Sequence, residues 1–268
     1  MTLASCDSRK TAGENPFFTE WDTPHGVPPF DKILPEHFMP AFERGMSLHE
    51  AEIDAITSNK DEATFENTIL AYDDAGQMLA QTELVFGMLC AAETNDRMQA
   101  LQEQAMPLLA AHRDKIRLDD KLFVRVKEVY DRRAALGLDA EQMRLLQKTY
   151  DSFVRAGALL DAEQKARLKE INGQLSLTAV KFGNNILAEN NNFVLELKSD
   201  ELDGLPAGIR DAAREKAQQM GKGDKWVFTL HKPSLIPLLT YSTRRDLREK
   251  IYKAYLNRCN NADEYDNK

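Results

Sequence analysis

The histidines are the residues of this chain best suited to hold a catalytic metal, but their spacing argues against such a site. A helical zinc-hydrolase motif reads His-Glu-x-x-His, because side chains four residues apart point the same way and grip one ion. No two histidines here are four residues apart; they are His25, His37, His49, His112 and His231. His49-Glu50 begins like the motif, but Ile53 stands where the second histidine belongs. We therefore predict no catalytic, cofactor-binding or metal-binding residue, and interpret His49 as a packed helix residue.

Of the three cysteines, only Cys6 lies in a pattern that could carry chemistry. Cys6, Cys90 and Cys259 are far apart in sequence and form no disulfide framework or metal-ligand pair. Leu3-Ala4-Ser5-Cys6 is similar to a bacterial lipobox, in which the cysteine receives a lipid. The basic and apolar regions of a signal peptide do not precede it, so either the start is truncated or the match is chance. We predict a tether over residues 1–14, lipidation at Cys6 and an exported, periplasmic or membrane-anchored lipoprotein; otherwise the protein would be cytoplasmic.

Other patterns that could carry chemistry have simpler structural interpretations. No Gly-x-Ser-x-Gly nucleophile elbow exists, and Cys90 lies in an apolar helical stretch, as a small buried hydrophobe would. Gly221-Lys222-Gly223-Asp224 lacks the spacing of a phosphate loop and predicts a plain turn. A cluster of arginines near the end predicts a solvated helix face paired with acids; its members are Arg244, Arg245, Arg248 and Arg258.

The charge balance excludes one class of partner. The chain carries 43 acidic and 35 basic residues, a net charge of -8, whereas nucleic-acid binding needs clustered cations that neutralise phosphates. No apolar run approaches the length of about 18 residues that a membrane-spanning helix needs. We therefore expect no nucleic-acid partner, and membrane contact only through a possible lipid anchor. Hydrophobic residues make up 43%, which suffices for a sizeable core.

The elements that would position these residues are mostly helices. Apolar residues three or four apart predict helices in the first half over residues 35–58, 65–92, 96–116 and 120–136. Gly76 lies inside the second helix and suggests a close approach of another helix there. The third helix is expected to bend or break before Pro107, and Gly137 is a natural stop for the fourth.

The second half adds further helices and a small β element. Leu-Asp-Ala-Glu-Gln occurs at Leu138–Gln142 and at Leu160–Gln164, and each copy puts Asp at an N-cap with Gln three residues on. These copies predict two helix starts. Strands are predicted over residues 193–197 and 226–230, paired across a helix near 206–220, with a last helix near 242–258. The predicted fold class is mainly α with a small two-stranded β element, in one domain over residues 15–268.

Several short segments together carry a resemblance that none would carry alone. The most distinctive is Thr64-Phe65-Glu66-Asn67-Thr68-Ile69, whose threonine can cap a helix. The others are Asn15-Pro16-Phe17-Phe18, Pro28-Pro29-Phe30-Asp31-Lys32-Ile33, Pro40-Ala41-Phe42, Thr94-Asn95-Asp96, Ala156-Gly157-Ala158-Leu159, Gly204-Leu205-Pro206 and Tyr241-Ser242-Thr243-Arg244-Arg245. Over roughly residues 15–268, the chain resembles the thimet oligopeptidase-like zinc metallopeptidases, and within them the peptidyl-dipeptidase (dipeptidyl carboxypeptidase) branch.

The resemblance implies the N-terminal half of a two-lobed metallopeptidase whose helical halves flank a deep channel. It implies zinc as the cofactor of the full-length enzyme, short unfolded peptides as substrates, and the C-terminal catalytic half as a partner. The family's His-Glu-x-x-His lies in that later half, and this chain ends before any such motif. No family catalytic residue can therefore be carried over, and we expect this chain alone to bind no catalytic zinc and to be inactive.

Two other interpretations stay open. The chain could be a non-catalytic helical interaction module that keeps the same fold, and a downstream His-Glu-x-x-His in the full-length gene would argue against that. It could also belong to a general endo-oligopeptidase without dipeptide specificity. Cleavage products from a C-terminally blocked peptide would distinguish the two peptidases, because a carboxypeptidase-type site needs the free carboxylate.

Overall fold

The computed structural model describes residues 14–268, which divide into two compact units between Leu177 and Thr178. Within that range the predicted fold class is confirmed, since helices dominate and a two-stranded antiparallel sheet accompanies them. Cys6 and almost all of the expected tether lie outside the described residues. None of the helices in the described range combines the length and the apolar character needed to cross a bilayer.

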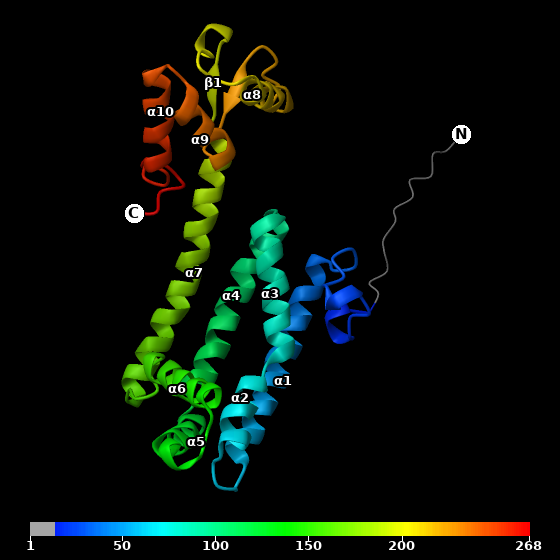
Figure 1. Cartoon of the computed structure of the whole chain (residues 1–268), viewed down its shortest axis with the longest axis vertical. Coiled ribbons are helices and arrows are strands. Elements are labelled where there is room, and N and C mark those ends of the chain that lie inside the picture. The colour runs from blue at the N-terminus through cyan, green and yellow to red at the C-terminus, as the bar shows by residue number, and fades with distance from the viewer. Residues whose placement is uncertain (1–13) are drawn as a thin grey trace, which may run out of the picture. The chain divides into compact units, whose positions relative to one another are not determined.

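The first unit is a set of packed helices, in which α1, α3 and α4 lie side by side (Figure 1). Its longer helices are α1 (Phe38–Ser58), α3 (Gln77–Ala92), α4 (Asp96–Arg117), α5 (Asp120–Asp131) and α6 (Ala140–Arg155). Its shorter elements are the 3-10 turns Pro16–Phe18, Pro24–Gly26, Pro35–His37 and Arg133–Ala135, the π-helix η4 (Phe65–Leu70) and α2 (Ala71–Asp74). Helix α7 (Ala162–Asn192) begins in this unit and ends in the second.

Two hydrophobic clusters stabilise the first unit. In one, the ring of Phe38 lies 5.3 Å from that of Phe17 and 5.0 Å from that of Phe86, between centroids. In the other, fully buried Phe153 packs against Tyr72 at 5.2 Å and against Phe123 at 6.1 Å. Because tilted and offset aromatic pairs add to the free energy of area burial, these clusters fix the mutual positions of the helices.

The second unit packs helices against the small sheet. Its elements after α7 are β1 (Leu195–Leu197), the 3-10 turn Ser199–Glu201, α8 (Ala207–Gln219), β2 (Trp226–Phe228), α9 (Lys232–Tyr241) and α10 (Arg245–Leu256). Leu195 pairs with Phe228 and Leu197 with Trp226, as expected for strands joined across a helix. Buried Leu235 and Leu238 of α9 complete the core with these strands. Helix α9 escaped prediction, because Pro233 and Pro237 disguise its helical pattern.

The predicted helix over residues 65–92 is wrong as a single element. It is interrupted after α2, where Ala75 is extended and Gly76 has a left-handed φ of +79°. The Gly76 N–H donates a 2.7 Å hydrogen bond to a Glu52 carboxylate oxygen. A Cβ at Gly76 would lie 3.0 Å from the His49 ring, so the close approach expected there is real. A side-chain acceptor from α1 thus replaces the backbone bond that a continuous helix would make.

Of the bend or break expected before Pro107, the break is wrong, because α4 is helical from Asp96 to Arg117. A proline removes one backbone hydrogen bond from a helix. Ala105 and Leu109 lie on either side of Pro107 and are almost fully buried, so packing against α1 and α3 outweighs that loss.

Both predicted capping boxes are confirmed: Asp139 and Asp161 accept the N–H groups of Gln142 and Gln164 at 2.9 and 2.8 Å.

Candidate functional site

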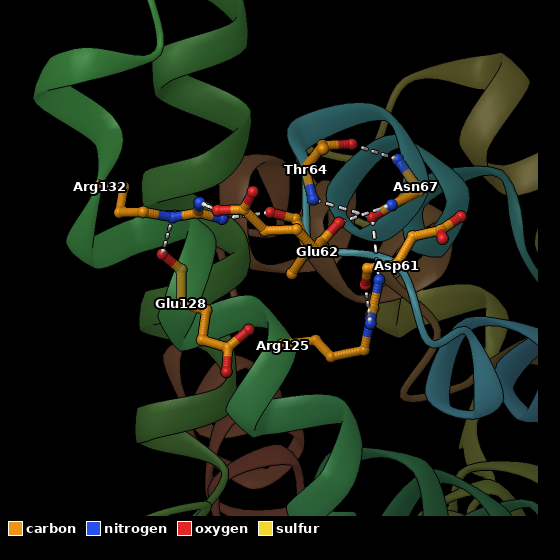
Figure 2. A network of polar contacts seen from close by, with 8 residues as sticks. Asp61, Glu62, Thr64, Asn67, Arg125, Glu128 and Arg132 are labelled. Carbon is orange, nitrogen blue, oxygen red and sulfur yellow. Dashed lines mark hydrogen bonds and ion pairs between the residues drawn. The ribbon is translucent and has the colours of Figure 1, made fainter.

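The most distinctive sequence segment builds a structural polar network (Figure 2). The Thr64 N–H donates to the Asn67 side-chain oxygen at 2.8 Å, and the Asn67 N–H donates back to the Thr64 hydroxyl at 3.1 Å. This reciprocal cap starts the π-helix η4, so the predicted cap at Thr64 is confirmed. The same Asn67 oxygen also accepts the Thr68 hydroxyl at 2.8 Å, which fixes the orientation of the amide.

Arg125 of α5 closes this network from the other side. Its side chain donates to the backbone carbonyls of Asn59 and Asp61 at 2.9 and 3.1 Å, and to the Asn67 side chain at 3.0 Å. The residue is only 8% exposed. We call Arg125 with these three acceptors the Arg125 clamp. It joins the loop after α1 to η4 and α5. These three hydrogen bonds offset the cost of burying the charge, while the buried Nε has no partner among residues 14–268.

Arg132 adds a second, more exposed support to the same loop. It forms an ion pair with Glu62, and its side chain also donates to the carbonyl of Ala63 and to that of Glu128. All three of these Arg132 contacts tie α5 to the loop before η4 or to its own preceding turn. The motif that carries the family resemblance therefore acts on the fold, and its residues have no visible catalytic arrangement.

A histidine pair lies between α1 and α4. The Nδ1 of His49 and the Nε2 of His112 are 3.0 Å apart, and His112 is only 5% exposed. Glu50 lies 3.4 Å from the Nδ1 of His112, a long contact, and 2.8 Å from the Lys115 ammonium. Sequence reasoning correctly predicted that His49 is packed, but it missed His112, which is 63 residues away. The only available signal was His112 on the apolar face of a helix.

Burial sets the ionisation of these histidines. Desolvation lowers the pKa of His49 and of His112 below the ordinary value of 6.5, and the neighbouring carboxylates of Glu50 and Glu52 oppose that effect only in part. The pair is therefore neutral near pH 7, with one ring N–H donating to the other ring nitrogen. Two nitrogens alone do not fit zinc, which takes four ligands in structural sites and three protein ligands in catalytic ones. Across residues 14–268, no group of three or more His, Cys, Asp or Glu side chains is placed to hold a metal.

We expect the first unit to lose stability as pH falls below about 6.5. Above that value both histidines are neutral in the folded and unfolded chain; below it the unfolded chain takes up protons that the folded pair, with its lowered pKa values, resists. Protonation therefore favours unfolding. Urea denaturation between pH 5 and 7.5 should show this slope, weakened in His112→Gln and unchanged in His231→Gln, whose side chain is exposed. Equal slopes in all three proteins would contradict the assignment.

The remaining sequence-predicted residues have no chemical role that the structure supports. Burial raises the pKa of the Cys90 and Cys259 thiols, so neither is an activated nucleophile. Cys90, which the sequence predicts to be buried, is only half-buried. In the arginine cluster, Arg244 pairs with Asp246 at 2.8 Å, and Arg258 donates to Asn190 at 3.1 Å. Lys222 of the predicted turn pairs with Glu196 on β1. These contacts support the structural interpretation of each pattern.

The described residues form a mainly helical protein, and no group of metal ligands is assembled among them. No family model matches the chain. The dipeptidyl carboxypeptidase of Escherichia coli is 36% identical over 94% of this chain, and that of Salmonella typhimurium is 34% identical over the same share. Oligopeptidase A of Escherichia coli is 26% identical over 91% of this chain. In all three cases the chain spans 37% of the relative's length.

The resemblance found in the sequence is thereby confirmed: the chain is homologous to the thimet oligopeptidase-like peptidases, through the dipeptidyl carboxypeptidases and the oligopeptidases A. Identity is higher to the two dipeptidyl carboxypeptidases than to the oligopeptidases A of three bacteria, which lie between 25% and 27%. Because the relatives are nearly three times longer, most of their sequence has no counterpart among these 268 residues.

Proposed function

We propose that this chain is the N-terminal portion of a zinc metallopeptidase that removes dipeptides from the C-termini of short peptides. The observation that carries the proposal is the 36% identity to a protein named dipeptidyl carboxypeptidase, over 94% of this chain. Its partners would be short unfolded peptides and its own C-terminal catalytic half. Zinc would be held by that half, since these 268 residues contain no histidines four apart.

The role of this portion would be to form a rigid channel wall that restricts entry to short, unfolded chains. The structure supports rigidity through the aromatic clusters of the first unit and through the Arg125 clamp, which ties a loop to two helices. Catalysis depends on holding the substrate in a near-attack geometry, and packed helices hold their side chains more tightly than loops do. The wall would thus act by positioning and exclusion, while bond cleavage happens elsewhere.

The purified 268-residue chain is expected to release no dipeptide from a short peptide with a free C-terminus. The longer protein encoded by its reading frame should release dipeptides, and a zinc chelator should abolish the activity. Mass spectrometry of the products measures both outcomes. A C-terminally amidated peptide serves as the matched control, because a carboxypeptidase-type site needs the free carboxylate. Internal cleavage of the amidated peptide would favour the endo-oligopeptidase, and chelator-sensitive activity of the 268-residue chain would overturn the proposal.

A non-catalytic helical interaction module is the alternative. The structural roles of the motif residues are compatible with it, because Asn67 and Arg125 hold the backbone of this fold in place. The adjoining reading frame separates the two, because the peptidase requires paired histidines one helical turn apart. Lipidation of Cys6 and export remain proposals, and the intact mass of the protein from bacterial membranes would test them. One plant relative is named a probable cytosolic oligopeptidase A, which suits the cytoplasmic alternative.

A further inference from the structure

A pocket rich in basic residues lies in the first unit, between the end of α4 and one face of α6. Its volume is about 460 Å³, within the range of small-molecule sites. Its lining consists of four cationic side chains and three other residues: Arg117, Arg144, Lys148 and Arg155, with Asp151, Ser152 and Ala156. A chain with eight more acids than bases thus gathers four positive charges around one hollow.

The position of these cations on α6 follows from the helix's buried face. Leu146 and Phe153 are fully buried, which turns the opposite face toward solvent. Arg144, Lys148 and Arg155 are spaced four and seven residues apart, so they share that outward face. Like charges four residues apart on a helix repel one another, so helix stability does not explain the arrangement.

Helix dipoles account for only part of the cluster. Arg117 and Arg155 lie in the last turns of α4 and α6, where the negative end of each dipole favours a cation. Arg144 and Lys148 lie in the first nine residues of α6, away from that end. The helix dipoles therefore do not explain the positions of Arg144 and Lys148.

Ion pairing does not neutralise this surface within the described part of the chain. Elsewhere in the unit, Lys115, Lys127 and Lys165 each pair with an acid. Arg144, Lys148 and Arg155 form no ion pair with any residue from 14 to 268, and all three are exposed. The single acid of the pocket, Asp151, accepts a 2.9 Å hydrogen bond from Gln147. The pocket keeps a strong positive potential, which attracts anions.

We propose that this pocket binds a compact anion that carries two or more phosphate groups. Arginine guanidinium groups donate in a planar fork that matches phosphate oxygens, and lysine adds a point charge. The Ser152 hydroxyl also lines the pocket and could donate to the ligand. The hollow favours a compact ligand over a flat membrane surface. An oligophosphate concentrates its charges within one hollow of this volume, whereas an acidic peptide spreads one carboxylate per residue along an extended chain.

Isothermal titration of the 268-residue chain with inorganic pyrophosphate tests the proposal. Saturable one-site binding is expected, and Arg144→Glu, Lys148→Glu and Arg155→Glu should each weaken it by about tenfold or more. Lys169→Glu is the matched control: it makes the same charge change at an exposed position of α7 outside the pocket, and should alter affinity by less than about twofold. Circular dichroism should show the same helix content in all variants, because the altered side chains are exposed.

Three results would overturn the proposal. The first is an absence of saturable pyrophosphate binding, and the second is equal weakening by Lys169→Glu, which would mean a diffuse charge effect. The third is tighter binding of a competing anion. Pentaglutamate that outcompetes pyrophosphate would assign the face to an acidic peptide, and anionic phosphatidylglycerol vesicles that do so would assign it to a membrane.

Discussion

Gly204→Ala is expected to destabilise the second unit by about 3 kcal/mol or more, because two independent costs coincide at this glycine. Its φ is +82°, a region that strains any residue with a Cβ, and a Cβ built there would lie 2.2 Å from the carbonyl oxygen of Tyr241. The Thr243 hydroxyl donates to the Asp203 carboxylate at 2.6 Å. This hydrogen bond ties the segment after Tyr241 to the residue before Gly204. Neither backbone segment can move away without breaking that contact.

Chemical denaturation followed by circular dichroism would measure this loss. Gly221→Ala is the matched control in the same unit, because Gly221 has a similar φ of +68° but no atom lies within 4 Å of its Cβ position. The free energy of unfolding of the control should fall by only about 1 kcal/mol, the cost of placing a residue with a Cβ in the left-handed region. If the two variants were equally stable, the close approach between Gly204 and Tyr241 would not exist in solution.

Arg125→Met should destabilise the first unit by roughly 3–5 kcal/mol. Methionine fills a similar volume but cannot donate, so the carbonyls of Asn59 and Asp61 and the Asn67 side chain would lose their charged donor. These acceptors lie at the junction of a loop and two helices, so the loss cannot be confined to one turn. The Arg125 clamp is therefore expected to contribute far more than a surface ion pair would.

Urea denaturation of Arg125→Met against Lys121→Met tests the clamp. Lys121 lies one helical turn earlier on α5 and is exposed, so its replacement should change the free energy of unfolding by less than about 0.5 kcal/mol. Arg125→Lys should fall between the two, because it keeps the charge but loses the planar fork. A stability of Arg125→Met close to that of Lys121→Met would show that solvent replaces the clamp at no cost.

Local interactions explain which parts of the fold were predictable. The capping boxes at Asp139 and Asp161 depend on residues three apart, and the strands depend on short apolar runs between turn residues. Such patterns are complete within a few residues of sequence. The family resemblance added the order of the segments, and the mainly α class with its small sheet followed from both.

The failures concern interactions that the local pattern does not contain. The break at Gly76 depends on Glu52, which lies 24 residues earlier, and the unbroken helix through Pro107 depends on packing against other helices. Helix α7 is another case, since its apolar residues Ile171, Leu175 and Phe182 share one helical face and are all exposed. Helical spacing predicts which residues share a face, but only tertiary packing decides whether that face is covered.

The polar sites also differ in whether local sequence reveals them. The shared face of Arg144, Lys148 and Arg155 is visible in their spacing, but the contribution of Arg117 from α4 is not. The pairing of His49 with His112, and that of Arg125 with Asn67, joins residues about sixty positions apart. Sequence reasoning proposed the helix cap at Thr64 correctly, yet the arginine that completes the network gave no local signal.

The Arg125 clamp also has a consequence for how proteases would cut this chain. Lys60 is exposed in the loop after α1 and offers trypsin an obvious target. The carbonyls on both sides of it, those of Asn59 and Asp61, are held by one buried guanidinium. Cleavage requires a stretch of backbone to detach and enter the enzyme, which here means withdrawing both carbonyls from the arginine at once. Surface accessibility at this bond therefore does not imply susceptibility, and digestion would begin at other sites.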